Sequence, residues 1–398
     1  MRIRDIKTRR SQRLLRRRLR LVTIVCLFTC LMGGGCRQKN NPASGEAVER
    51  PGGNFAEVHP VYAEGFTVTH TPTARLIDIR DPQQESARSF HYALAPKGTV
   101  PQDIPEGYTV IWTPVRSVIC MTSLQLSNFI KLDARECVAG VTSTRHLFDG
   151  KMNRQLEEGK TAKIGIEGNF DSEVIMSIEP DVIFISPFKR GGYDILRDVD
   201  IPLIPHLGYK ETTPLGQAEW IKFIGMFIGK EEQANTLFAA IETRYNELKA
   251  LAAKQRKRPV IFSGEMRGGN WYAVGGKSFL AQLFNDAGGE YFLKDDPHSG
   301  GVTLDYETVY SQAENADYWR IVNSYDGTFS YDALRSEDSR YADFRAFRDK
   351  GIIYCNMRRK PFYESMPVEP ELVLSDFIRV FHPGILPDYV PHYYELLR

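Results

Sequence analysis

The 398-residue chain is predicted to form two α/β lobes with mainly parallel central sheets, joined by one long helix. Three observations predict this fold class. Short β-branched runs alternate with amphipathic stretches over residues 115–206 and again after residue 258, which is typical of βα units and parallel sheets. Between these regions lies a long helical stripe. The third observation is a short internal repeat: the pattern Asp-x-Glu begins an apolar helix at Asp171 and again at Asp305.

The N-terminus has the layout of a lipoprotein signal. Nine arginines and one lysine precede residue 21, and an apolar run of twelve residues and three glycines then lead to Cys36. Twelve residues are too few to cross a bilayer but suit the apolar core of a signal peptide. We therefore predict a signal over residues 1–35 and lipidation at Cys36. Two alternatives stay open: an ordinary secretory signal with a chance cysteine, and a twin-arginine signal at Arg9 and Arg10.

Without the signal, the chain carries 41 basic and 49 acidic side chains, a net charge near −8. This balance argues against nucleic-acid binding, which needs a concentrated basic surface. Cys120, Cys137 and Cys355 remain besides Cys36, each in or beside an apolar run. We predict that these three are small core side chains and not a disulfide framework.

The order of elements before the long helix indicates a tether and one lobe. Residues 36–56 are polar and rich in Asn, Gly and Pro, which predicts a flexible tether. The N-terminal lobe is expected over residues 57–212. It begins with an antiparallel extension, for which strands are predicted at residues 66–70, 74–79 and 89–94. The βα units follow, with elements predicted at residues 115–120, 124–132, 137–141, 163–166, 171–178, 181–186 and 201–206.

The middle of the chain, residues 213–256, is predicted to be helical. Thr213 before Pro214 suits a helix N-cap followed by a first-turn proline. Apolar residues from Leu237 to Ala252 then recur at spacings of 4, 4, 3 and 4, a helical stripe. The second helix would be about 36 Å long, which suits a strut between lobes. A routine surface helix of one large α/β domain is the alternative.

The C-terminal lobe is expected over residues 257–398, where the βα alternation resumes. Its elements are predicted at residues 259–263, 279–287, 318–322, 344–350, 351–355 and 370–381.

An ordered series of segments resembles the substrate-binding proteins of ABC importers for iron complexes (siderophores and haem) and cobalamin. The resemblance covers essentially everything after Val61. The segments are Pro114-Val115-Arg116-Ser117-Val118, the stretch of residues 165–181, Ala218-Glu219-Trp220-Ile221-Lys222, Val274-Gly275-Gly276-Lys277-Ser278 and Asp286-Ala287-Gly288-Gly289.

The resemblance implies two lobes joined by a single rigid helix, and a protein that performs no chemistry. It further implies a receptor that captures an iron chelate, is held in the cell envelope by its lipid anchor and faces the periplasm or the outer surface. The partners would be the chelate, an ABC permease with its ATPase, and the membrane through the anchor. Haem or cobalamin are alternative ligands. A chelatase-like enzyme of similar fold and a partner-binding lipoprotein are alternatives of another class.

The resemblance implies a docking role for two acidic residues. Family members place one exposed acid on each lobe, and these acids meet arginines of the permease. Glu173 and Glu307 occupy the matching positions, each in the first turn of its helix. Acids are also favoured near helix N-termini by the helix dipole alone, so a purely structural role is the alternative.

The ligand is expected beyond the carboxyl ends of the parallel strands. The loops there carry basic and aromatic side chains, which suit the anionic oxygens and flat apolar parts of a chelate. The candidates are Arg145, Phe188, Lys189, Arg190, Arg267, Trp271, Tyr272, Tyr325, Arg358, Arg359 and Tyr363.

Direct capture of a free metal ion is not predicted. The eight histidines are scattered, and no cysteine pair has zinc-type spacing. A metal would therefore arrive inside an organic ligand, and no resident cofactor is expected. If the ligand is haem, Tyr272 or Tyr363 could ligate its iron. The chain also lacks a phosphate-binding loop, a Gly-x-Ser-x-Gly elbow and a His-Glu-x-x-His helix, so we expect no enzyme.

Overall fold

The computed structural model describes residues 56–84, 89–102, 104–142, 144, 146–166, 169–186, 196 and 200–398. The predicted signal, the lipidation site Cys36 and the tether up to residue 55 lie outside these residues. So do the predicted ligand residues Arg145, Phe188, Lys189 and Arg190. The described residues belong to one compact unit, and no helix among them is both long and apolar enough to cross a membrane.

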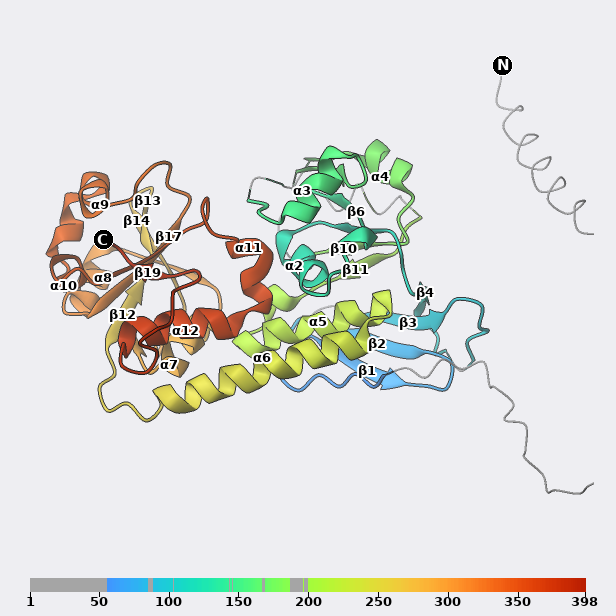
Figure 1. The fold of residues 1–398 in the computed structure, drawn as a ribbon, viewed down its shortest axis with the longest axis horizontal. Coiled ribbons are helices and arrows are strands. Elements are labelled where there is room, and N and C mark those ends of the chain that lie inside the picture. Colours follow the sequence, from blue (N-terminus) through green and yellow to red (C-terminus); the bar gives the residue numbers. More distant parts are fainter. Residues whose placement is uncertain are drawn as a thin grey trace, which may run out of the picture. The chain divides into compact units, whose positions relative to one another are not determined.

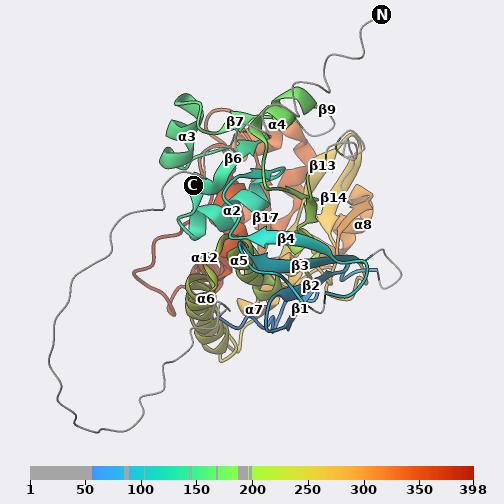
Figure 2. The same ribbon diagram turned by 90° about the vertical axis from the view of Figure 1, so that its right-hand side faces the viewer.

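A four-stranded sheet precedes the first lobe and packs against the buried helix α5 (Pro214–Ile228) (Figure 2). Phe66 packs on Trp220 and Phe223 of α5, with ring centroids 5.0 and 5.4 Å apart. The first three strands pair antiparallel, as predicted, whereas the fourth joins in parallel. In sheet order the strands are β1 (Phe66–His70), β2 (Arg75–Ile79), β3 (Phe90–Pro96) and β4 (Thr109–Thr113).

Two buried carboxylates of the α5 region hold the segment before β1. Glu219 is fully buried and accepts hydrogen bonds from the backbone N–H groups of residues 61–63, at 2.7 to 2.9 Å. Glu211 accepts from the N–H groups of residues 64 and 65 and from Trp220 Nε1. Because charge-assisted bonds are stronger than neutral ones, this segment is firmly attached to α5.

The N-terminal lobe is built on a parallel sheet in the order β11-β10-β5-β6-β7. Strands β5 and β10 are buried along their whole length, as expected for a parallel sheet covered on both faces. The elements are β5 (Val118–Cys120), α2 (Ser123–Lys131), η1 (Arg135–Cys137), β6 (Val138–Val141), α3 (Gly150–Glu157), β7 (Ala162–Lys163), β8 (Gly165–Ile166), β9 (Asn169–Phe170), α4 (Ser172–Ile178), β10 (Val182–Ile185), β11 (Leu203–Pro205) and η3 (Gly208–Lys210). The three described cysteines are free and buried.

Two consecutive helices connect the lobes. Every residue of α5 is buried, which is typical of a helix surrounded by other elements. Thr213 caps it and Pro214 occupies its first turn, as predicted. Gly229, with φ 71°, ends α5 and lets the chain turn into α6 (Glu231–Ala252), which lies along α5 (Figure 1). Its 22 residues span about 33 Å, and we call α6 the interlobe helix.

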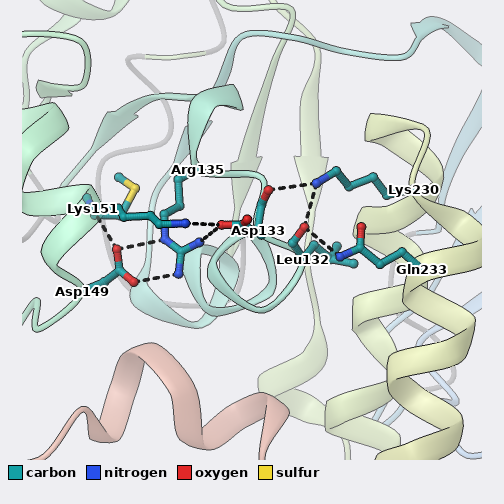
Figure 3. A network of polar contacts seen from close by, with 8 residues as sticks. Leu132, Asp133, Arg135, Asp149, Lys151, Lys230 and Gln233 are labelled. Atoms are coloured by element: carbon teal, nitrogen blue, oxygen red, sulfur yellow. Dashed lines mark hydrogen bonds and ion pairs between the residues drawn. The ribbon is translucent and has the colours of Figure 1, made fainter.

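The interlobe helix is fixed at both ends. Lys230, just before it, donates to the carbonyl oxygens of Leu132 and Asp133 in the N-terminal lobe, at 2.7 and 2.8 Å. Figure 3 shows that Asp133 also belongs to an ion-pair network with Arg135. Near the other end, Tyr245 donates to Asp286 of the C-terminal lobe at 2.8 Å. The lobes therefore share a connector with polar contacts to each of them.

The C-terminal lobe has a central sheet in the order β15-β12-β17-β18-β19, parallel except for the last pair. Its strands are β12 (Val260–Ser263), β15 (Glu290–Tyr291), β17 (Tyr318–Asn323), β18 (Ile352–Asn356) and β19 (Glu395–Leu396). Its helices are α7 (Phe279–Asp286), α8 (Tyr306–Ala313), α9 (Tyr331–Glu337), η4 (Ser339–Asp343), α10 (Arg345–Arg348), α11 (Phe362–Ser365), η5 (Met366–Val368) and α12 (Pro370–Phe381). Together the two sheets confirm the predicted α/β fold of two lobes.

A second, antiparallel sheet in this lobe was not predicted. It contains β13 (Glu265–Arg267), β14 (Asn270–Val274) and β16 (Gly301–Leu304). The prediction treated residues 264–272 as a loop, but Gly268 and Gly269, with φ of 57° and 85°, make a tight hairpin turn there. Side chains alternate in a strand, so successive residues of β14 face opposite sides.

Helices α4 and α8 begin in the same way, as the internal repeat in the sequence predicts. Asp171 caps α4 by accepting from Val174 N at 3.0 Å, and Asp305 caps α8 by accepting from Thr308 N at 2.7 Å. Glu173 and Glu307 follow their caps by two residues, and both are exposed. The two acids therefore occupy equivalent positions in the two lobes.

Candidate functional site

An apolar hollow near the carboxyl ends of the strands lies between the two lobes, with a volume of about 560 Å³. We call it the interlobe cavity. Residues after β5 and β6 line it from the N-terminal lobe, and residues of β14, β17 and the α11 region line it from the other. This position agrees with the rule that ligands bind beyond the carboxyl ends of parallel strands. The volume lies within the usual range for small-molecule sites.

Most of the cavity wall is apolar or neutral. Met121, Leu124 and Thr142 line it from one lobe, and Phe279 and Phe362 line it from the other. Among the described residues, its charged lining side chains are Glu211 and Arg320. Glu211 already accepts the three bonds that attach the segment before β1 to α5, and burial raises the pKa of this carboxyl. The guanidinium of Arg320 is therefore the charged group with which a ligand could pair.

Arg320 lies on β17, half-buried in the cavity wall. Its Nε donates to Tyr394 Oη at 3.1 Å, and Nη2 contacts the same oxygen. Burial raises the pKa of Tyr394, so this hydrogen-bond partner is a neutral phenol. The carboxyl of Glu265 attracts Arg320 electrostatically but forms no ion pair with it. Nη1 has no hydrogen-bond partner among the described residues, which makes it available to an anionic oxygen.

Tyr394 is itself held by a buried carboxylate. Asp376 of α12 is fully buried and accepts from Tyr389 Oη and from the N–H groups of residues 392–394, at 2.7 to 2.9 Å. The C-terminal segment is thereby fixed beneath β17, and Tyr394 Oη fixes the guanidinium. Arg320 is thus pre-organised before any ligand enters, which lowers the entropic cost of binding.

Of the seven predicted ligand residues that the structure describes, Tyr363 lines the interlobe cavity. Its side chain is 45% exposed, and its ring lies 6.5 Å from that of His146 across the two lobes. Arg267 and Tyr325 instead line a separate, polar pocket of about 300 Å³. There the burial of Glu265 raises the pKa of its carboxyl.

The guanidinium groups of Arg358 and Arg359 donate hydrogen bonds to backbone carbonyl oxygens of the protein. Arg358 Nε donates to Ser324 O at 2.8 Å, and Arg359 Nη2 donates to Gly327 O at 2.9 Å. Tyr272 is 47% exposed on β14 and does not line the interlobe cavity. These two arginines and Tyr272 therefore lie outside the wall of the cavity, and their ligand role stays a prediction.

Trp271 requires a correction. Its side chain is fully buried, packs in tilted contacts among Phe262, Trp319 and Phe344, and donates from Nε1 to Ser263 O at 2.9 Å. The reason is the hairpin: Trp271 faces the core of the lobe while its neighbour Tyr272 faces outward. Its ring therefore cannot cover a ligand.

Metal-binding side chains do not cluster in the described part of the chain, where no group of three His, Cys, Asp or Glu side chains could hold an ion. The interlobe cavity offers one arginine and several neutral polar groups, while the carboxylate of Glu211 is already bound by N–H groups of the protein, so the lining suits an organic anion better than a bare cation.

Two α/β sheets, a connecting helix and a cavity between them define the class of bilobed binding proteins. The chain belongs to the periplasmic binding protein family, whose model matches residues 118–358. This family consists of substrate-binding proteins of ABC importers. The resemblance seen in the sequence is therefore confirmed.

Similar proteins agree with this family. An uncharacterised lipoprotein of Methanocaldococcus jannaschii is 25% identical over 306 residues, covering 74% of this chain and 71% of that protein. A periplasmic haem-binding protein of Pseudomonas aeruginosa has a TM-score of 0.55 at 15% identity, covering 68% of this chain and 94% of that one. An ABC-type Fe3+-hydroxamate transport protein of Saccharomonospora viridis has a TM-score of 0.54 at 19% identity, with the same coverage. At these identities the two structures show a shared fold.

Proposed function

We propose that this protein is the lipid-anchored receptor of an ABC importer, that it binds a ferric chelate of the siderophore type in the interlobe cavity, and that it delivers the chelate to a membrane permease. The observation that carries the proposal is Arg320, an arginine whose hydrogen-bond partner among the described residues is a neutral phenol, in a mostly apolar or neutral wall. Such a wall suits a bulky organic ligand with an anionic group. The similar solved structures include a haem-binding protein and an Fe3+-hydroxamate transport protein, which supports an iron chelate.

The direct test is equilibrium dialysis of the purified full chain against a ferric hydroxamate, a ferric catecholate, haem and cobalamin. We expect a ferric siderophore to bind with micromolar or tighter affinity, about −8 kcal/mol. Tight binding of haem or cobalamin alone would move the protein to the alternative ligands. Binding of none would contradict the transport proposal and favour an enzyme or a partner-binding lipoprotein.

Arg320→Gln locates the site. Loss of a charge-assisted hydrogen bond, worth about 1.5 to 3 kcal/mol, should weaken binding of an anionic chelate about tenfold to a hundredfold. Arg335→Gln is the matched control, since Arg335 is an exposed arginine of the same lobe, 3.6 Å from Asp332. If Arg267→Gln weakened binding and Arg320→Gln did not, the ligand would lie in the smaller polar pocket.

A further inference from the structure

A second large hollow lies along β19, the edge strand of the C-terminal sheet, with a volume of about 890 Å³. We call it the edge groove. It shares no lining residue with the interlobe cavity. Most of its wall comes from residues 360–398, which lie beyond the part of the chain that the family model matches. Neither the family nor the proposed transport function accounts for it.

The walls of the edge groove are held in place by hydrogen bonds. On one side, Leu397 N donates to Ile352 O at 2.8 Å and so attaches the last residues to β18. On the other side, the four bonds accepted by buried Asp376 fix residues 389–394. Arg379 Nη1 donates to Pro383 O at 3.3 Å and steadies the loop between them. The groove is therefore a formed feature and not the gap beside a loose terminus.

Four basic side chains line the edge groove: Lys350, Lys360, Arg379 and Arg398. Glu395 is the acidic side chain of the lining. In the part of the chain that the structure describes, no carboxylate lies within ion-pair distance of any of the four, although ion pairs are common elsewhere on the surface. The predicted mature chain has a net charge near −8, so this cluster of cations stands out against an acidic protein.

Apolar side chains lie between these cations. Val390 is 80% exposed and Leu396 is 40% exposed, and both line the edge groove. Val380 forms part of the same wall. Exposed aliphatic groups beside cations suit a ligand with an anionic head and an apolar body. A free inorganic anion would use the cations but leave the aliphatic side chains in water.

We propose that the edge groove binds anionic phospholipid at a membrane surface, with the phosphate against the four cations and the acyl region against Val390 and Leu396. Each Lys or Arg near an anionic surface contributes to attraction, and the attraction falls with salt. A basic surface patch adds to the membrane attachment that a lipid anchor provides, so such a groove would give an anchored receptor a second contact with the membrane. The lipid contact does not require the ligand of the interlobe cavity.

The test is co-sedimentation of the full chain with vesicles of phosphatidylcholine that contain phosphatidylglycerol, compared with vesicles of phosphatidylcholine alone. We expect binding to the anionic vesicles that decreases as salt is raised. Lys360→Gln with Arg398→Gln should weaken it about twenty-five-fold, since each cation accounts for about fivefold. The control pair is Lys163→Gln with Lys277→Gln, exposed cations outside the groove, which should change binding little.

Val390→Asp and Val100→Asp provide the apolar comparison, because both valines are 80% exposed and only Val390 lines the groove. Val390→Asp should weaken binding and Val100→Asp should not. All variants keep the same N-terminal segment, so any contact of this segment with vesicles is the same in each variant and drops out of the comparison. An unchanged melting temperature shows that each variant is folded.

Equal losses in the test and control pairs, or equal binding to neutral vesicles, would overturn the proposal. The proposal would also be overturned if inorganic phosphate, at the same concentration as the lipid phosphate, displaced the protein from the vesicles, because the groove would then bind a free anion. Binding of poly-glutamate but not of vesicles would assign the groove to an acidic protein segment.

Discussion

Glu371 of α12 is a half-buried glutamate, one of whose carboxylate oxygens is buried. Its Oε2 has no hydrogen-bond partner among the described residues, and burial raises the pKa of its carboxyl from 4.5 to about 7. Because the folded pKa lies above the unfolded one, the stabilising contribution is complete below about pH 4.5 and is lost as the pH rises through about 7. Ionised Glu371 therefore lowers stability in neutral and alkaline solution.

We expect Glu371→Gln to raise the free energy of unfolding at about pH 8 by up to about 3 kcal/mol and to leave it nearly unchanged at about pH 4. Urea unfolding at both pH values measures the difference. Glu232→Gln, at an exposed glutamate, should show no such pH dependence. A stability difference that is the same at both pH values would contradict the assigned ionisation.

Single residues show where sequence reasoning about the site was limited. Tyr363 was predicted because it follows a predicted strand, and the structure places it in the cavity wall, while its ligand role stays a prediction. Arg320, which lies in the same wall, was not among the predicted residues because it lies inside a predicted strand and not in a loop. The signal was present: its neighbours Trp319 and Ile321 are apolar and buried, and a charge within such a strand is unusual unless it has a partner or a ligand.

Among the elements, α5 makes its strongest polar contacts through Glu219. Its carboxylate receives backbone N–H groups from residues 61–63 and lies 2.7 Å from Lys222 Nζ. Glu219→Gln keeps the shape but removes the charge and turns one acceptor into a donor that faces N–H groups. We expect a loss of about 2 to 4 kcal/mol in the free energy of unfolding, measured by urea titration.

Glu242→Gln is the control for this loss. Glu242 is half-buried and accepts one hydrogen bond, from Tyr62 Oη at 2.7 Å. The amide oxygen of Gln can still accept it, so this substitution should cost less than about 1 kcal/mol. Equal losses for the two variants would show that the charge of Glu219 matters no more to the segment before β1 than that of Glu242.

Elements with a strong periodic pattern were predictable, and those set by a turn were not. The parallel strands and the interlobe helix follow from runs of buried residues and from a regular apolar stripe. The hairpin of β13 and β14 depends on two glycines with positive φ, and only their conformation shows that the chain reverses there. This one missed turn explains why Trp271 was assigned to a ligand site.

At the scale of the whole molecule, the equivalent acids of the two lobes predict how the protein meets a permease. Glu173 and Glu307 are exposed in the first turns of α4 and α8, two residues after aspartate caps. Neither lines the interlobe cavity. If they dock the two lobes on arginines of the permease, removing both should abolish stimulation of its ATPase and leave ligand affinity unchanged.

The experiment is an ATPase assay of the reconstituted permease with Glu173→Ala and Glu307→Ala in one chain, alongside equilibrium dialysis of the ligand. Glu232→Ala is the matched control, because Glu232 is exposed in the first turn of α6 and shares the favourable helix dipole. Removing a favourable interaction with the helix dipole should lower the free energy of unfolding by well under about 1 kcal/mol per acid. We therefore expect the variants to stay folded, and lost stimulation would not be due to unfolding. Retained stimulation by the double variant would show that the acids serve only their helices, whereas lost stimulation with unchanged ligand affinity would separate docking from capture.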